Sequence, residues 1–317
     1  MASVRNIVVL NQLAERHITM LKNTDPDIAI HIATLESAAA LMAEAEILAA
    51  WGWMEIEPLY QLAPNLRWVH ALSAGVENLT FPALQSSPVI LTNSKGIHGI
   101  PASEHVLSIM LAFTRGLNLL IRRQQQALWQ RVPTNELHEK TIAIVGLGSI
   151  GRSIAKTAKC LGMTVIASKR ELTKEIFVDR LYSPDQLKLM LAQADFVVLT
   201  VPLTEETDHF FGLEQFQAMK KTAYFINIAR GSVVNEPDLV TALEQGTIQG
   251  AGLDVFEHEP LPASSPLWNM PNVIITPHMA AISPAYLDRA IQLFADNVGR
   301  YIQGGDMVNV VDKVKGY

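Results

Sequence analysis

Short runs of β-branched and other apolar residues alternate with longer helical patterns along the whole chain. This alternation is typical of parallel sheets covered by helices on both faces, because a parallel connection is long enough to hold a helix. Two series of strands are expected. The first series comprises residues 6–10, 28–33, 46–50, 67–71 and 89–92. The second series comprises residues 141–146, 163–167, 195–201, 223–228, 250–255 and 273–276.

Helical patterns mark the two places where the chain passes from one series to the other. The first begins near Pro101, a favourable residue for a first helical turn, and runs toward Arg131. The second follows Ser283-Pro284 and runs to about Ile302. The chain therefore crosses between two sheets twice, and its last segment returns to the first sheet.

These crossings predict an α/β protein with two doubly wound parallel-sheet domains. One domain is expected to be discontinuous, with residues 1–99 and 285–317, and the other to be an insertion of residues 100–284. Sites in such sheets lie outside the carboxyl ends of the strands. A cleft between the two domains is therefore the expected active site.

The composition fits a compact protein and excludes several classes of partner. A chain of 317 residues with 49% hydrophobic and 18% charged residues can bury two cores. The formal net charge of −6 gives no basic excess for binding nucleic acid or an anionic membrane. No clustered spacing of His, Cys and Asp indicates a metal site.

The single cysteine, Cys160, excludes an intrachain disulfide and suits a reducing compartment. The first ten residues resemble a strand and lack the apolar core and cleavage site of a signal peptide. No run of 18 uncharged apolar residues is present, so no membrane span is expected. Together these features predict a cytoplasmic protein.

A glycine-rich sequence follows the first strand of the second series and opens a helical pattern. Gly146 permits a tight turn, Gly148 lets the backbone approach a pyrophosphate, and Gly151 allows close packing of helix and strand. The free N–H groups at the start of the helix, including those near Ser149 and Ile150, favour phosphate oxygens. The alternative is a tight turn with a structural role only.

The next strand ends in Ser168-Lys169-Arg170, where an NAD-selective site would carry an acidic residue for the ribose 2′-hydroxyl. A hydroxyl and two cations favour a 2′-phosphate instead, so NADP(H) is the preferred cofactor and NAD(H) a possible one. Two alternatives stay open. Lys169 and Arg170 could form an ordinary solvated loop, and Glu171 could accept from the ribose.

Three further residues carry the expected chemistry. Arg230 follows the strand of residues 223–228, and its planar guanidinium matches a carboxylate or an α-keto acid in two-point contact. His278 ends the last strand and can exchange protons near neutral pH. Glu259 could orient the imidazole and favour its protonated form. The alternatives are a structural ion pair for Arg230 and a packed histidine.

These residues and several ordered segments resemble the D-isomer-specific 2-hydroxyacid dehydrogenase family, in its NADP-preferring glyoxylate/hydroxypyruvate reductase-like branch. The matching segments are 73–76, 146–151, 201–207, 227–231, 252–256, 259–262 and 271–278. The resemblance covers nearly the whole chain. It implies a Rossmann cofactor domain inserted into a flavodoxin-like substrate domain, and a homodimer formed through the cofactor domain.

The resemblance also implies roles for individual residues. Arg230 would bind and polarise a 2-keto acid, Glu259 would tune the histidine, and His278 would be the acid/base. The substrate carboxylate would be bound by the backbone N–H groups of Ala74, Gly75 and Val76. Further cofactor contacts would come from Val201, Pro202, Thr207, Ile228, Ala229, Arg230, Asp254 and His278, with Asp254 at the nicotinamide amide.

The expected function is reduction of a small 2-keto acid to the D-2-hydroxy acid by hydride transfer from NADPH. One alternative from another class stays open, because fold alone does not fix function. The same fold could serve a redox sensor or corepressor-like protein that binds NAD(P)H without metabolic turnover. The presence of Arg230, Glu259 and His278 argues against that alternative.

Overall fold

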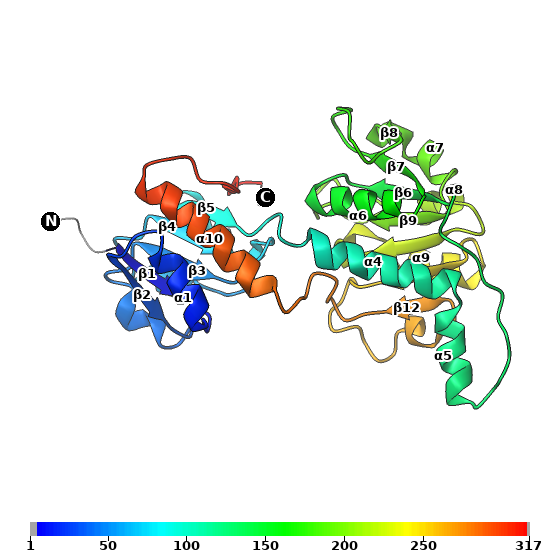
Figure 1. Ribbon diagram of the computed structural model, residues 1–317, viewed down its shortest axis with the longest axis horizontal. Helices are drawn as coiled ribbons and strands as arrows, with labels where there is room; N and C mark the ends of the chain where they lie inside the picture. Colours follow the sequence, from blue (N-terminus) through cyan, green and yellow to red (C-terminus); the bar gives the residue numbers. More distant parts are fainter. Residues whose placement is uncertain (1–4, 316–317) are drawn as a thin grey trace. The chain divides into compact units, whose positions relative to one another are not determined.

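The computed structural model describes residues 5–315 and divides into two compact units. Unit 1 contains Met1–Ile97 and Ser283–Tyr317, and unit 2 contains His98–Ile282. Each boundary lies two residues from the one expected from the sequence. Each unit is a parallel sheet with helices on both faces (Figure 1).

Unit 1 contains a five-stranded sheet with the order β2-β1-β3-β4-β5. Its strands are β1 (Arg5–Val9), β2 (Ile28–Ile32), β3 (Ile47–Ala50), β4 (Trp68–Ala71) and β5 (Ile90–Asn93). Its helices are α1 (Glu15–Lys22), η1 (Ala38–Leu41), α2 (Glu57–Tyr60), η2 (Glu77–Leu79), α3 (Pro82–Gln85) and α10 (Tyr286–Ile302). This strand order is the flavodoxin-like doubly wound arrangement.

Alternate residues of the unit 1 strands point to opposite faces, and each face has its own core. Ile7 and Val9 of β1 pack with Phe294 and Val298 of α10. Val8, between them in sequence, belongs to the core on the other face of the sheet. The return of α10 to this sheet therefore completes the core of unit 1.

Unit 2 contains a seven-stranded parallel sheet with the order β12-β11-β10-β9-β6-β7-β8. Its strands are β6 (Thr141–Val145), β7 (Thr164–Ser168), β8 (Arg180–Tyr182), β9 (Phe196–Leu199), β10 (Tyr224–Asn227), β11 (Gly250–Leu253) and β12 (Val273–Ile275). Its α-helices are α4 (Gly99–Thr114), α5 (Leu117–Gln125), α6 (Ser149–Cys160), α7 (Leu187–Leu191), α8 (Leu213–Ala218) and α9 (Glu236–Glu244). Its 3₁₀ helices are η3 (Pro184–Gln186), η4 (Gly231–Val233) and η5 (Pro266–Asn269).

Starting from β6, the order of the unit 2 strands is that of a Rossmann fold, extended by one strand beyond the sixth. The order of strands reverses between β6 and β9, which is the switch point at which such sheets bind ligands. The fold class predicted from the sequence is confirmed in both units.

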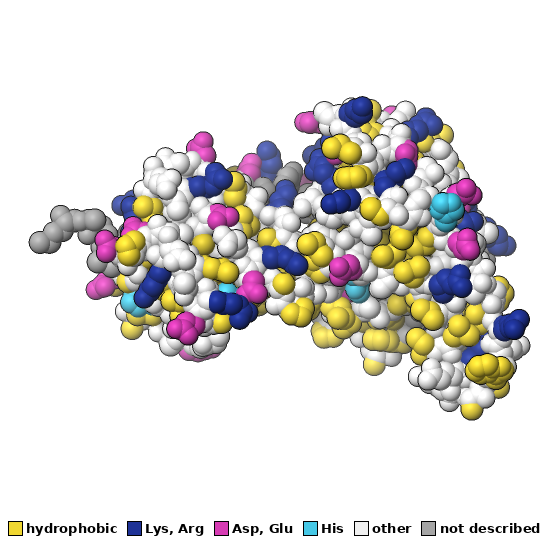
Figure 2. Space-filling model, in the orientation of Figure 1, with side chains coloured by type: hydrophobic (Ala, Val, Ile, Leu, Met, Phe, Trp, Pro, Cys, Tyr) yellow, Lys and Arg dark blue, Asp and Glu magenta, His cyan; other side chains and the backbone are white. Residues whose placement is uncertain are grey.

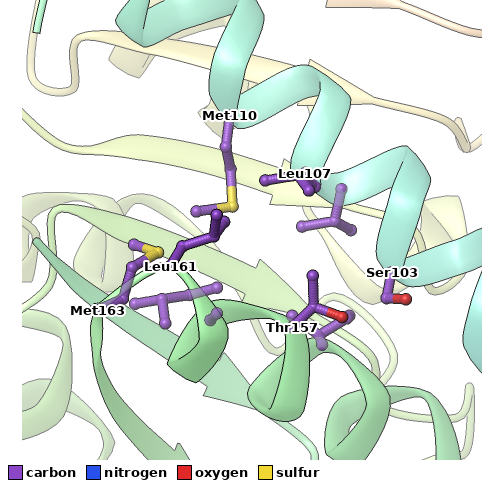
Figure 3. A pocket seen from close by; sticks show the side chains of 10 residues that line it. Ser103, Leu107, Met110, Thr157, Leu161 and Met163 are labelled. Atoms are coloured by element: carbon purple, nitrogen blue, oxygen red, sulfur yellow. The ribbon is translucent and has the colours of Figure 1, made fainter. Parts of the chain in front are cut away.

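Helices α4 and α6 pack side by side on one face of this sheet. Figure 3 shows Leu107 and Met110 of α4 facing Leu161 and Met163, around a cavity of about 10 Å³. A cavity of this size holds at most one water molecule. The apolar residues of α4 that face the sheet are therefore part of the core of unit 2. Leu117, beyond the end of α4, is instead partly exposed.

Two local features differ from the expectation. The helix expected from Pro101 toward Arg131 is broken at Gly116, whose φ of 66° is left-handed, and α5 continues at 68° to α4. Strand β8 was not expected, because its three residues at the sheet edge carry no apolar alternation. It adds a seventh strand beyond β7.

Among residues 5–315, no single helix is long and apolar enough to cross a membrane. Only the bent pair of α4 and α5 together reaches that length and composition. The apolar residues of α4 that face the sheet are buried within unit 2.

Candidate active site

The carboxyl ends of six strands of unit 2 lie in register along one edge of its sheet. Pairing aligns one residue from each strand in a continuous row: Ser168, Val145, Leu199, Asn227, Leu253 and Ile275. The glycine loop, the two cations, Arg230, Asp254 and His278 each follow one of these residues within a few positions. The sheet therefore brings the residues predicted for the cofactor and for catalysis to a single edge.

The glycine loop after β6 has the shape that a dinucleotide needs. A side chain at Gly146, whose φ is 97°, would lie 2.7 Å from Cγ1 of Val201. One at Gly151 would lie 2.5 Å from the carbonyl oxygen of Gly146. A side chain at the exposed Gly148 would meet no atom within 4 Å, so the backbone there is open to an approaching phosphate.

Helix α6 begins directly after this loop. Its N-cap residue, Gly148, makes no side-chain capping bond, so the first N–H groups near Ser149 and Ile150 face outward from the helix start. The aligned peptide dipoles add a partial positive charge there. Loop and helix start together fit a pyrophosphate.

The segment after β9 packs beside the glycine loop. Val201 contacts Gly146, and the hydroxyl of Thr207 donates to the carbonyl of Pro202 at 2.7 Å. After β10, the side chain of Asn227 accepts from the N–H of Ala229 at 3.0 Å. Ile228 precedes Ala229, so these residues predicted for cofactor contact follow β9 and β10 at the same edge of the sheet.

The end of β7 and the loop that follows it, residues 168–175, are called the ribose loop below, because residues 168–170 are predicted to meet the cofactor ribose. Its first residue, Ser168, is buried at the strand end. Lys169 Nζ donates to Thr173 Oγ1 at 2.9 Å and to Glu175 Oε1 at 2.8 Å. Arg170 forms an exposed ion pair with Glu206 at 2.5 Å. Lys169 is thus paired within the loop, and the carboxylate that meets it is Glu175.

Arg230 lies half-buried three residues after the end of β10, at the start of η4. Its Nη1 donates to the carbonyl of Ala229 at 2.8 Å, and its own carbonyl accepts from Asn227 at 3.1 Å. Burial, together with the charge of Arg230, lowers the pKa of His98 to about 4. His98 is therefore neutral at physiological pH and leaves Arg230 as the cation of this part of the edge.

The predicted proton-transfer pair is formed within unit 2. His278 Nδ1 lies 2.7 Å from Glu259 Oε2, and the histidine side chain is half exposed. The other oxygen of Glu259 accepts from the backbone N–H of Phe256 at 3.1 Å, which fixes the carboxylate. A hydrogen bond at Nδ1 leaves the opposite ring nitrogen, Nε2, for a reacting group.

The loop of residues 276–280, called the catalytic loop below, is held by the buried carboxylate of Asp254. Its oxygens accept from the hydroxyl of Thr276 at 2.6 Å, from the N–H of Met279 at 2.9 Å and from the N–H of Ala280 at 2.8 Å. His278 lies within this loop with a φ of 49°. Such a left-handed histidine is strained by about 1–3 kcal/mol, which these bonds offset.

His105 of α4 contacts the same hydrogen-bond network around Asp254 and Thr276. Its Nε2 lies 3.1 Å from the hydroxyl of Thr276 and 3.7 Å from Asp254. Burial lowers the pKa of His105, and the charge of Asp254 opposes that shift. His105 therefore lies beside Asp254, the carboxylate that holds the catalytic loop.

In unit 1, the loop of residues 73–76, which is predicted to bind the substrate carboxylate, follows β4. Ser73 Oγ accepts from the N–H of Gly52 at 2.9 Å and donates to the carbonyl of Gly75 at 2.8 Å. Asn93 Nδ2 donates to the carbonyl of Ala74 at 2.8 Å. A side chain at Gly52 would lie 1.9 Å from the Gly75 oxygen, so this position requires glycine. These bonds fix the carbonyl groups of Ala74 and Gly75. A loop that is to offer its N–H groups to an anion needs a backbone held in this way.

A cavity of about 320 Å³ lies at the opposite edge of the unit 2 sheet. It is lined by Lys140, Asp195 and Tyr224, among others, at the amino ends of β6, β9 and β10. This cavity is far along the strands from the row that carries Arg230 and His278. It is therefore separate from the candidate active site.

No group of three or more His, Cys, Asp or Glu side chains able to hold a metal occurs in the part of the chain that the structure describes. Charged residues at the edge instead form pairs: Lys169 with Glu175, Arg170 with Glu206, and Glu259 with His278. His278, held by Glu259, can exchange a proton with a bound substrate, and Arg230 can bind an anion.

Comparison with known proteins decides the family. The family model of the D-isomer specific 2-hydroxyacid dehydrogenase NAD-binding domain matches residues 107–280, which lie within unit 2. The chain belongs to this family. The resemblance inferred from the sequence is therefore confirmed, and the chain is an oxidoreductase of the D-2-hydroxyacid dehydrogenase type with an NAD-binding domain.

Individual relatives extend the match to both units. Glyoxylate/hydroxypyruvate reductase B of Escherichia fergusonii is 35% identical, over 96% of this chain and 94% of its own length. A D-isomer specific 2-hydroxyacid dehydrogenase family protein from Aeromonas salmonicida is 39% identical and superimposes with a TM-score of 0.89, covering 98% and 100% of the two chains.

A third similar protein is the NADPH-dependent glyoxylate/hydroxypyruvate reductase of Sinorhizobium meliloti, solved in complex with NADP and sulfate. It is 27% identical with a TM-score of 0.83, and the match covers 99% of this chain and 100% of that chain. The two named reductases place this chain in the glyoxylate/hydroxypyruvate reductase-like branch of the family.

Two residues of the edge escaped the sequence analysis. Arg152 of α6 donates to Glu175 through Nε at 3.0 Å and Nη2 at 2.8 Å. Arg152 directly follows the last glycine of the glycine loop, and this position was the only sequence signal for it. Nothing in the sequence pattern singled out Glu175, because its partners come from other elements.

Proposed function

We propose that this protein reduces a small 2-keto acid to the D-2-hydroxy acid with NADPH, with glyoxylate and hydroxypyruvate as the first candidates. The observation that carries the proposal is the Glu259–His278 pair at 2.7 Å, on the sheet edge that also holds Arg230 and the glycine loop. The names of the similar reductases support this choice of substrate. They do not favour a sensor without turnover.

The residues act on the substrate as follows. Arg230 binds the 2-keto acid and stabilises negative charge on its carbonyl oxygen. His278 donates a proton to that oxygen, and Glu259 stabilises the imidazolium before the transfer. The N–H groups of Ala74, Gly75 and Val76 bind the substrate carboxylate.

The residues of unit 2 fit a dinucleotide. The open backbone at Gly148 and the start of α6 would hold the pyrophosphate, and Ser168, Lys169 and Arg170 would meet a 2′-phosphate. Asp254 would contact the nicotinamide amide beside the catalytic loop that it holds. The cofactor supplies the hydride, and the protein supplies position and charge.

We also propose that the protein is a homodimer through the cofactor domain. Exposed apolar side chains lie on α5 and on the segment that follows it, at the tip of unit 2 in Figure 2: Leu117, Leu119, Ile121, Leu128 and Trp129. Apolar surface of this kind favours association. Sedimentation equilibrium would show a mass of two chains; the mass of one chain at micromolar concentration would contradict this proposal.

The cytoplasmic location stays a prediction.

The proposed activity is tested by steady-state kinetics with glyoxylate, hydroxypyruvate and pyruvate, each with NADPH and with NADH. We expect turnover with at least one 2-keto acid, and NADPH favoured by about tenfold in kcat/KM, which corresponds to about 1.4 kcal/mol. Cofactor binding without turnover of any 2-keto acid would leave the sensor as the better description. A preference for NADH would overturn the assignment of the ribose loop.

A further inference from the structure

The cations of the ribose loop already have an anion. Glu175 accepts three bonds: one from Lys169 and two from the guanidinium of Arg152, at 2.8–3.0 Å. Only 15% of its side chain is exposed. These hydrogen bonds, that of Arg152 first, lower the pKa of Glu175 to about 2. The carboxylate is therefore ionised at every physiological pH.

This arrangement satisfies the same donors that a phosphate monoester would require. A two-point contact from an arginine and a further bond from a lysine are the usual contacts of protein-bound phosphate. Arg152 belongs to the first turns of α6, beside the glycine loop, and Lys169 directly follows the end of β7. Glu175 thus occupies donors at the place where the ribose of a dinucleotide is expected.

The neighbouring pair of Arg170 and Glu206 differs in exposure. Their side chains are 66% and 76% exposed, so water and salt can replace each partner at little cost. Lys169 is only 15% exposed, as Glu175 is. Figure 2 shows Lys and Arg side chains gathered over the part of unit 2 that carries α6, β7 and β8. Within that basic region, Glu175 is the less exposed and better bonded of the two acidic partners.

We propose that Glu175 is a specificity-determining residue that competes with the 2′-phosphate of NADPH for Arg152 and Lys169. An incoming phosphate must displace the carboxylate or remain beside it, and both cost free energy, because like charges repel and three charge-assisted bonds are rearranged. NADH has no 2′-phosphate and leaves the pair intact. Glu175 therefore limits the preference for NADPH and allows NADH to bind. This inference rests on the proposed cofactor site.

The test is the variant Glu175→Gln, which keeps the size of the side chain and removes its charge. NADPH and NADH dissociation constants are measured by fluorescence titration, and those of adenosine 2′,5′-bisphosphate and 5′-AMP by calorimetry. We expect Glu175→Gln to bind NADPH and the bisphosphate at least threefold more tightly. Binding of NADH and 5′-AMP should change by less than twofold.

A matched control is Glu214→Gln, because Glu214 pairs with a lysine of the same unit, Lys188, at an exposed position on α8. It should leave all four dissociation constants unchanged. In an Arg152→Ala background, the gain from Glu175→Gln should shrink, since one of the two released cations is absent. Thermal unfolding checks that each variant is folded.

Unchanged or weaker NADPH and bisphosphate binding in Glu175→Gln would overturn the inference. Equally weaker binding of all four molecules would show that Glu175 only holds the loop together. The proposed function fails separately, by absence of 2-keto acid reduction, while tighter bisphosphate binding would still support the inference. If no nucleotide binds the wild type or the Glu175→Gln variant, both the proposed function and this inference are wrong.

Discussion

The catalytic loop and the ribose loop lie on the same edge of one sheet, and each is held by a carboxylate, but the two carboxylates bind differently. Asp254 is buried and accepts from two backbone N–H groups and a hydroxyl. The carboxylate of Glu175 accepts from the side-chain cations of Arg152 and Lys169. Backbone donors cannot rotate away, whereas lysine and arginine side chains can change partner. The structure thus fixes His278, the proposed proton-transfer residue, whereas the side-chain pairs of the ribose loop can rearrange.

The largest expected effect concerns the residue that the catalytic loop presents. His278→Gln removes the proton donor, and we expect kcat to fall at least about 100-fold, because a general acid contributes about 10²–10⁴-fold. Steady-state kinetics measures the loss, and fluorescence titration should show NADPH binding retained. Turnover near that of the wild type would place the acid elsewhere.

The next effect concerns the support of that loop. Asp254→Asn weakens charge-assisted bonds to Met279 and Ala280, each contributing about 1.5–3 kcal/mol, so His278 loses its position. We expect kcat to fall about tenfold, with a lower melting temperature.

Asp195→Asn is the matched control for this change. Asp195 likewise accepts from a backbone N–H, that of Thr141, but at the opposite edge of the sheet. That variant should lower the melting temperature and leave kcat unchanged. If both variants lowered kcat equally, the comparison between a fixed and an adjustable loop would lose its basis.

A smaller effect is expected in the ribose loop. Lys169→Ala with Arg170→Ala should raise the KM for NADPH by about tenfold or less, because partly exposed charges are screened. The KM for NADH should stay nearly unchanged, and so should kcat. Equal weakening of both cofactors would mean that another group reads the ribose.

The two loops also differ in how far the sequence predicted them. Arg230 and His278 were predicted because each follows a recognisable strand, and Glu259 because a carboxylate could orient the histidine. The register of parallel strands then brings the strand ends to one edge. The left-handed conformation of His278 was not predicted, since the bonds that hold it come from the carboxylate of Asp254, which follows another strand. Lys169 was predicted as a cation at a strand end.

The partners of Lys169 could not be predicted. The irregular segment between β7 and β8 determines where Glu175 lies, and no periodic pattern fixes such a segment. The break at Gly116 has a similar cause, because a glycine within a helical pattern is compatible with both a continuous and a broken helix. The sequence therefore predicted the sheet edge and the partner of His278, and missed Arg152 and Glu175, which pair beside Lys169.

The central claim is that His278 transfers the proton while Glu259 favours its protonated form. The most direct test is the pH dependence of kcat/KM for 2-keto acid reduction and for 2-hydroxy acid oxidation, in the wild type and in Glu259→Gln. Glu257→Gln serves as control, because Glu257 pairs instead with His209.

Reduction requires the protonated ring, so its rate should fall as pH rises, while oxidation requires the neutral ring and should rise over the same range. Removing the Glu259 charge makes the imidazolium less favourable, so both limbs should move to lower pH in Glu259→Gln and stay in place in Glu257→Gln. The assignment of Glu259 and His278 would be contradicted if the pH profiles of reduction and oxidation ran in the same direction. It would also be contradicted if Glu259→Gln left both profiles unmoved.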